Sequence, residues 1–188
     1  MLVAAEKKGP ASYADIEALP EQVVGEILDG ELIVSPRPAS PHAWAASQLG
    51  ADLIGPFGRE KGGPGGWVIL LEPELHFGPQ VMVPDLAGWR RQRMPRMPDV
   101  PFFELAPDWV CEVVSPSTAR VDRSRKMRHY AQARVAHAWL VDPVATTLEI
   151  YRLDGAGWRL VDTYAGDEDV RPEPFDVLPL NLANLWAR

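Results

Sequence analysis

The sequence predicts an α/β fold, of the α+β type with a mixed sheet, on three observations. Proline and glycine are plentiful, at 19 and 15 of 188 residues, and their clusters divide the chain into short elements, which disfavours a helical bundle. Apolar runs rich in β-branched residues alternate with two helical patterns. Turn signals flanked by such runs occur towards both ends of the chain, which predicts β-hairpins there.

The first expected elements are a short helix and a hairpin. Ser12 and Asp15 have the spacing of a capping box, which predicts a helix over residues 12–19. Asp29-Gly30 is the pair that a two-residue type I′ turn favours, because both positions need a positive φ. The flanking strands are expected at residues 24–28 and 31–34.

A longer helix should follow the hairpin and face the core. Ser40 is a plausible N-cap, and Pro41 suits the first helical position. The pattern extends over residues 43–57. Its apolar positions are Trp44, Leu49, Leu53 and Ile54.

The middle of the chain predicts strands joined by proline and glycine turns. We expect them at residues 67–71, 75–77 and 81–87, and we expect the three to form a meander. The apolar run 109–114 reads as the central strand of the sheet, interrupted by one charge, Glu112. A helix at 122–134 and a strand at 138–141 should follow. A second hairpin is expected from residues 147–153 and 158–164.

Length and composition limit the function. A chain of 188 residues with 46% hydrophobic residues suits one folded domain, residues 1–188. The net charge of -7 disfavours non-specific adhesion to DNA or to an anionic membrane. The single cysteine, Cys111, excludes an internal disulfide and a cysteine-based zinc site. The N-terminus shows no export signal or membrane span, so we expect a cytoplasmic protein without a membrane partner.

Two acidic residues stand out because they interrupt apolar strand patterns. Asp85 follows the run 81–84, and Glu112 lies inside the run 109–114. Burying a carboxylate is costly unless it is paired or binds a metal. Two carboxylates at the ends of neighbouring strands would form a hard oxygen site of the kind Mg²⁺ uses. The alternative is that each pairs with a nearby arginine. The histidines lack zinc-ligand spacing, and a Gly-x-Ser-x-Gly nucleophile motif is absent.

Several segments together resemble the Uma-two family, which is assigned to the PD-(D/E)XK restriction-endonuclease-like superfamily. The segments that carry the resemblance are residues 26–32, His42, residues 83–86, residues 107–118, then Asp122, Lys126 and Tyr130, and finally residues 139–143. The resemblance implies a restriction-endonuclease-like core with the N-terminal and C-terminal β-hairpins added to it. It also implies that Asp85 and Glu112 hold Mg²⁺, or Mn²⁺, with a lysine near the attacking water.

The lysine departs from the superfamily pattern. That pattern places lysine two residues after Glu112, where this chain has Val114. Lys126 on the next helix is the obvious substitute, because its long stem can return the ammonium to the strand end. The alternative is that Lys126 pairs with Asp122 on a solvated face.

Three further residues are accessory candidates. Glu26 would add a carboxylate to the acidic cluster, although a glutamate at a strand edge is commonly solvated. His42 lies at the start of a predicted helix, where it would orient a substrate phosphate or serve only as a cap. Asp122 lies one helical turn before Lys126. Tyr130 is interpreted as a core residue, and one of Glu72 and Glu74 is expected to point inward.

The resemblance therefore implies a Mg²⁺-dependent endonuclease that hydrolyses phosphodiester bonds of DNA, acting as a homodimer. The alternative is a non-catalytic nucleic-acid-binding or regulatory module that keeps the fold, and Val114 in place of lysine motivates it. An arginine cluster on a predicted loop is the candidate phosphate contact, with a merely solvated loop as the alternative. Its members are Arg90, Arg91, Arg93 and Arg96.

Overall fold

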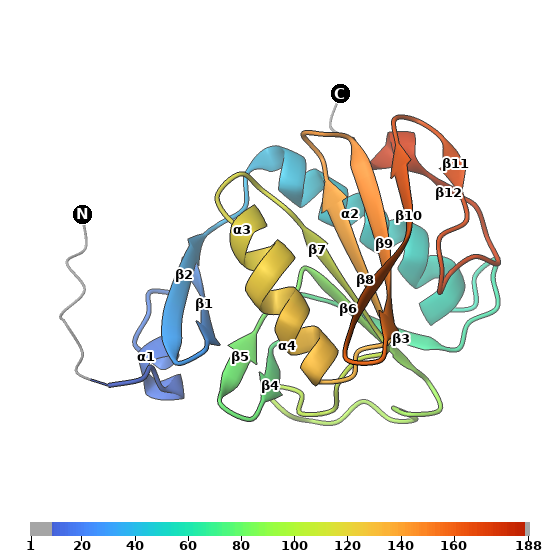
Figure 1. Cartoon of the computed structure of the whole chain (residues 1–188). Helices are drawn as coiled ribbons and strands as arrows, with labels where there is room; N and C mark the ends of the chain where they lie inside the picture. The colour runs from blue at the N-terminus through green and yellow to red at the C-terminus, as the bar shows by residue number, and fades with distance from the viewer. Residues whose placement is uncertain (1–8, 187–188) are drawn as a thin grey trace.

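The computed structural model describes residues 9–186 and is built on a six-stranded mixed sheet (Figure 1). The strand order is β10-β9-β8-β7-β6-β3, and only β7 and β8 run parallel. The predicted central strand, β7, lies inside the sheet. The six strands are β3 (Trp67–Leu71), β6 (Leu86–Arg90), β7 (Trp109–Val113), β8 (His137–Asp142), β9 (Thr147–Asp154) and β10 (Gly157–Ala165).

A second sheet of four short strands stands beside the first, in the order β2-β1-β5-β4. Its strands are β1 (Val23–Leu28), β2 (Glu31–Pro36), β4 (Leu75–Phe77) and β5 (Gln80–Met82). The predicted N-terminal hairpin is confirmed, because Asp29 and Gly30 take φ values of 57° and 78°. The short helix α1 (Tyr13–Glu17) precedes it, with the expected capping box.

The expected meander is wrong. The chain leaves β3 for the small sheet, forms the β4–β5 hairpin there, and returns to pair β6 with β3. The run predicted as one strand, 81–87, is therefore two strands separated by Val83-Pro84-Asp85. Pro84 lacks the N–H that a continuous ladder needs, which places the break here. This break puts Asp85 at the beginning of β6.

Helix α2 (Ser40–Leu53) covers one face of the large sheet and continues into a π turn, Ile54–Gly58. The N-cap is Ala39 rather than Ser40, so the helix begins one residue earlier than expected. Leu49 and Leu53 are buried as predicted, whereas Trp44 is 47% exposed. The Trp44 ring lies towards the C-terminal segment, where its Nε1 donates to the Asn184 carbonyl.

The other face of the sheet is covered by a continuous helical segment (Figure 1). It consists of α3 (Ala119–Val121), a π turn (Asp122–Lys126) and α4 (Met127–Gln132). Two apolar cores result. One joins α2 to β7 through residues such as Leu49 and Trp109, and the other joins α4 to the sheet through residues such as Tyr130 and Leu140.

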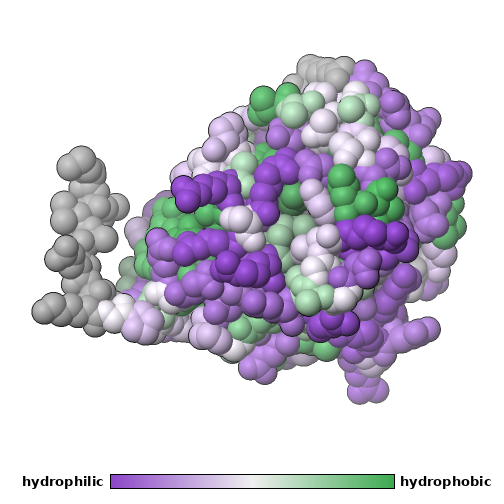
Figure 2. All heavy atoms as spheres, viewed as in Figure 1, coloured by the Kyte–Doolittle hydropathy of each residue, from purple (hydrophilic) through white to green (hydrophobic). Residues whose placement is uncertain are grey.

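The C-terminal segment closes the α2 side of the molecule. It contains the two-stranded sheet β11 (Asp169–Val170) and β12 (Leu180–Asn181), followed by a 3-10 turn, Leu182–Leu185. The β9–β10 hairpin precedes it as predicted. Hydrophilic residues cover most of the face seen in Figure 2, and hydrophobic residues gather over the N-terminal hairpin. Within residues 9–186, every helix is too short or too polar to cross a membrane.

His137, at the start of β8, predicts an acid-sensitive fold. Burial and the nearby charges of Arg152 and Arg90 lower the pKa of His137 from 6.5 to about 4. The folded protein therefore binds fewer protons than the unfolded chain between these values. The contribution of His137 to the free energy of unfolding is therefore fully present above pH 6.5 and is lost as the pH falls towards 4. We expect His137→Gln to flatten the decline over this window in urea titrations; an unchanged slope would contradict the assignment.

Candidate active site

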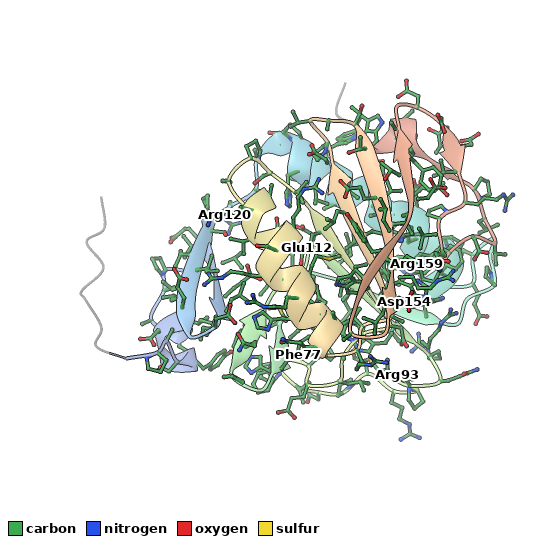
Figure 3. All side chains as sticks on the ribbon, viewed as in Figure 1. Phe77, Arg93, Glu112, Arg120, Asp154 and Arg159 are labelled. Atoms are coloured by element: carbon green, nitrogen blue, oxygen red, sulfur yellow. The ribbon has the colours of Figure 1, made fainter. Side chains whose placement is uncertain are left out.

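A cleft of about 340 Å³ lies where the N-terminal hairpin, α2, the end of β7 and the second helical segment meet. Its walls come from segments far apart in the sequence, so the cleft is a product of the tertiary fold. Six of the predicted site residues line it: Glu26, His42, Asp85, Glu112, Asp122 and Lys126. In Figure 3, Glu112 lies behind the helical segment that carries Lys126.

Asp85 and Glu112 come from adjacent antiparallel strands. Leu86 of β6 pairs with Cys111 of β7. Asp85 directly precedes Leu86 and Glu112 directly follows Cys111, so the two acids come at the same end of this strand pair. The two carboxylates therefore share one end of the β6–β7 pair and one cleft.

The Asp85 carboxylate is held by two donors. Its Oδ2 accepts the Val113 N–H at 2.7 Å, and its Oδ1 lies 3.2 Å from Nε2 of His42 on α2. Burial lowers the pKa of His42, but the hydrogen bond and charge of Asp85 outweigh burial and the pKa is raised. His42 therefore serves as the donor to Asp85, which restrains the carboxylate in the cleft.

Lys126 is enclosed by carboxylates. Its Nζ lies 2.9 Å from each oxygen of Glu112, 3.0 Å from Oε1 of Glu26 and 3.9 Å from Oδ1 of Asp122. The side chain is only 3% exposed, so the solvated i, i+4 pair with Asp122 considered above is wrong. Burial lowers the pKa of Lys126, but the surrounding carboxylates outweigh it and the pKa is well above its usual value. Lys126 is therefore a charged ammonium.

Glu26 belongs to this cluster and is not a solvated edge residue. It projects from β1, is buried, and accepts the Val83 N–H at 2.8 Å in addition to its contact with Lys126. The Val83 carbonyl in turn accepts a hydrogen bond from Lys126 at 3.2 Å. The backbone break between β5 and β6 thus ties the small sheet, through Glu26, to the helix that carries the lysine.

The cluster carries an excess of negative charge. Three carboxylates, from Glu26, Glu112 and Asp122, lie around the Lys126 ammonium, and the Asp85 carboxylate lines the same cleft beside His42. Burial raises the pKa of Glu112 well above its usual value, and the other carboxylates add to the rise although Lys126 opposes it. Burial also raises the pKa of Asp122, with Lys126 opposing. A site with these properties favours the uptake of a proton or a cation.

A π turn places the helical residues of the site. The Met127 N–H reaches back five residues to the Asp122 carbonyl, so the turn is wider than an α-helical turn. Such single π turns are frequent at functional sites. Asp122 and Lys126 are both buried within this turn, while the intervening Arg123 is exposed.

Val114 explains why the lysine comes from the helix. The Val114 side chain is buried in the α4-side core, among residues such as Met127 and Tyr130. Position 114 lies on the same face of β7 as Glu112, because it is two residues further along the strand. The ammonium beside Glu112 is that of Lys126, on the covering helix.

The arginine cluster lies at the other end of β6 from Asp85. Arg90 is the last residue of that strand, and its guanidinium lies 4.0 Å from the Trp67 ring centroid. Arg93 pairs with Asp108 at 2.9 Å, and Figure 3 shows it on the loop far from Glu112. Arg91 and Arg96 are exposed. The cluster therefore does not line the cleft, and its contact with phosphate stays a prediction.

Two site residues were missed by sequence reasoning. Tyr130 is buried as expected, but its hydroxyl donates to Oε1 of Glu112 at 2.5 Å. Its position four residues after Lys126 was the available signal. Arg37 lines the cleft from the segment between β2 and α2 and is exposed; a lone arginine between two prolines gave no signal. Of the glutamates flanking Pro73, Glu72 lines the cleft.

The cleft fits a divalent cation held by two carboxylates. Among residues 9–186, no group of three or more Asp, Glu, His or Cys side chains is arranged as a metal site. Mg²⁺, however, commonly takes one or two carboxylates and completes its shell with water and substrate phosphate. The hard oxygen donors of Asp85 and Glu112, and the unbalanced negative charge around them, match that requirement.

Comparisons with known proteins place the chain in a family and show a similar fold. The model of the Uma2 family, described as "Putative restriction endonuclease", matches residues 10–183. The fold is similar to a crystal structure from Anabaena variabilis ATCC 29413, described as "a putative nuclease belonging to DUF820", with a TM-score of 0.77. The two chains are 23% identical over 94% of this chain and 98% of the other. The predicted mixed α+β fold is confirmed. The search of curated proteins found no match.

Proposed function

The chain belongs to the Uma2 family, described as "Putative restriction endonuclease", and on this premise we propose that it is a Mg²⁺-dependent endonuclease acting on DNA. The observation that carries the proposal is the convergence of Asp85, Glu112 and Lys126 in one cleft. Two carboxylates and an ammonium are the groups that phosphodiester hydrolysis needs, because negative charge develops on the phosphate oxygens. A nucleic acid is the substrate class that the family description supports.

The roles of the side chains follow from their contacts. Asp85 and Glu112 would hold Mg²⁺, or Mn²⁺ in its place. The bound cation would supply Lewis-acid polarisation of the scissile phosphate. Lys126 places a fixed positive charge beside Glu112, where it stabilises charge developing on phosphate oxygen. His42 restrains Asp85, while Glu26 and Asp122 hold the lysine.

The test uses a supercoiled plasmid, because an endonuclease cuts a circle that has no ends. We expect nicking and linearisation with Mg²⁺ or Mn²⁺, and no cleavage after the cation is removed with EDTA. Calorimetric titration with Mn²⁺ measures cation binding independently of turnover. Absence of both cleavage and cation binding would overturn the proposal.

A non-catalytic module is the second candidate, and one contact favours it. Lys126 lies within hydrogen-bond distance of both Glu112 oxygens, so the ammonium already neutralises one proposed ligand. In that function the protein would bind nucleic acid and the cation without cutting. Cation binding and DNA binding without cleavage of circular or linear DNA would identify this outcome.

Arg37 is expected to contact a substrate phosphate, because it is an exposed cation lining a cleft rich in carboxylates. Arg37→Ala should reduce the slope of log affinity for DNA against log salt by about 1. Fluorescence anisotropy with labelled DNA measures this slope. The matched comparison replaces all four arginines of the Arg90–Arg96 cluster; a change confined to that variant would place the DNA on the loop.

Assembly and location complete the proposal. We propose a homodimer, which would present two clefts to one duplex, and sedimentation velocity measures its mass. We also propose a cytoplasmic location, which suits the buried, unpaired Cys111 because thiols stay reduced there.

A further inference from the structure

Tyr130 combines a fully buried ring with a hydroxyl that needs a hydrogen-bond partner. Its ring is fully buried in the core between α4 and the sheet. A phenylalanine would fill this space without the cost of removing a hydroxyl from water. The hydroxyl donates to Oε1 of Glu112 at 2.5 Å. The polar end of this core residue is thus directed to the carboxylate of the site.

The donors around Glu112 limit how its carboxylate can turn. Oε1 accepts from Tyr130 and lies 2.9 Å from Lys126, and Oε2 accepts from Lys126 at 2.9 Å. Tyr130 and Lys126 thus donate to different oxygens of Glu112, and the same ammonium also lies within ion-pair distance of Oε1. A carboxylate offers about four lone-pair positions, so these donors restrain its orientation and leave it acceptor capacity for a cation.

The two donors have different chemistry. Lys126 carries a charge that repels a second cation, and its ammonium is shared among Glu112, Glu26 and Asp122. Tyr130 is neutral, and its ring is locked by packing on α4. Groups that contact a metal ligand rather than the metal set the ligand's orientation, and their loss weakens metal affinity by about 10–100-fold.

We propose that Tyr130 is a positioning residue, which holds Glu112 in the orientation that binds a divalent cation. This inference rests on the proposed function, because it takes Glu112 as a ligand. Without the hydroxyl, Oε1 retains only the Lys126 ammonium, which is shared with Oε2 and with Glu26, and the carboxylate gains freedom that cation binding must remove. The effect should therefore appear in cation affinity and not in the rate with the cation bound.

The test is Tyr130→Phe, which deletes the hydroxyl and keeps the ring. We expect Mn²⁺ binding, measured by calorimetry without DNA, to weaken by about 10–100-fold. Plasmid cleavage should need correspondingly more cation, while turnover at saturating cation stays within a few-fold of wild type. Urea unfolding of the cation-free protein checks that the variant is folded.

Tyr151→Phe is the matched control. The Tyr151 hydroxyl donates to Oε2 of Glu149 at 2.5 Å on β9, so the same type of hydrogen bond is removed outside the cleft. This control should bind Mn²⁺ as the wild type does. A general loss of stability would affect both variants, whereas positioning of Glu112 affects only Tyr130→Phe.

The outcomes separate this inference from the proposed function. Wild-type binding of Mn²⁺ with equal affinity in Tyr130→Phe would overturn the positioning role and leave the proposed function standing. Equal weakening in both tyrosine variants would overturn it as well. A wild-type protein that binds no divalent cation would overturn both proposals together.

Discussion

Replacing Lys126 with methionine is expected to lower the free energy of unfolding by about 3–5 kcal/mol. Methionine keeps the stem volume but removes the ammonium that contacts Glu26 and Glu112. Both carboxylates are buried, so they lose their counter-ion in a place where water cannot replace it. Urea unfolding at pH 7, without divalent cation, measures the effect.

Removing one of the carboxylates should reverse part of this loss. Glu26→Gln in the Lys126→Met background deletes a negative charge and keeps the oxygen that accepts the Val83 N–H. We expect the double variant to be more stable than Lys126→Met alone. A Lys126→Met protein whose free energy of unfolding lies within about 1 kcal/mol of wild type would show that the cluster does not depend on its lysine.

The double variant also separates the structural and catalytic roles of Lys126. If it is folded and binds Mn²⁺ but cleaves DNA at least about 10²-fold more slowly, the lost charge acts on the reacting phosphate. Turnover equal to wild type would restrict Lys126 to holding the carboxylates together.

Short sequence patterns predicted those helices and strands whose ends are marked by residues nearby in the chain. Asp29-Gly30 marked the hairpin, and the apolar run 109–114 marked the inner strand β7. Which strands pair with each other depends on residues far apart in the sequence, so local patterns did not predict it. The separation of β5 from β6 depends on Pro84 and on Ile27 of β1 pairing with Val81 of β5, a contact 54 residues apart in sequence.

The residue types of the candidate site were predictable from the sequence, but the burial of its side chains was not. Lone acids in apolar runs singled out Asp85 and Glu112, and the family resemblance added Lys126. The burial of Glu26 depends on how the small sheet docks beside the helix, which no pattern near Glu26 records. Tyr130 was assigned to the core by its apolar neighbours, because a phenol that packs and also donates looks the same in sequence as one that only packs.

Asp85→Asn is expected to lower the rate of cleavage by at least about 10³-fold without lowering the free energy of unfolding. Lys126→Met, by contrast, is expected to lower the free energy of unfolding strongly. Asparagine keeps an oxygen for the Val113 N–H, so the local backbone contact is preserved, but its NH2 group replaces the oxygen that faces His42. The Asp85 charge raises the pKa of both Glu112 and Asp122, which means that it repels them. Relief of this repulsion should offset the lost contact with His42, so we expect the cation-free protein to be about as stable as wild type, while Mn²⁺ binding is lost.

Asp108→Asn is the control that makes the result specific, because Asp108 repeats the local geometry at the other end of the same strand pair. Its Oδ2 accepts the Arg90 N–H at 2.7 Å, just as Asp85 accepts that of Val113, but it pairs with Arg93 away from the cleft. Calorimetry with Mn²⁺, plasmid cleavage and urea unfolding of both variants give the comparison. Asp108→Asn should bind Mn²⁺ and cleave as the wild type does. If Asp85→Asn also binds Mn²⁺ with wild-type affinity, Asp85 is not a ligand, and the excess charge of the cleft serves some group other than a divalent cation.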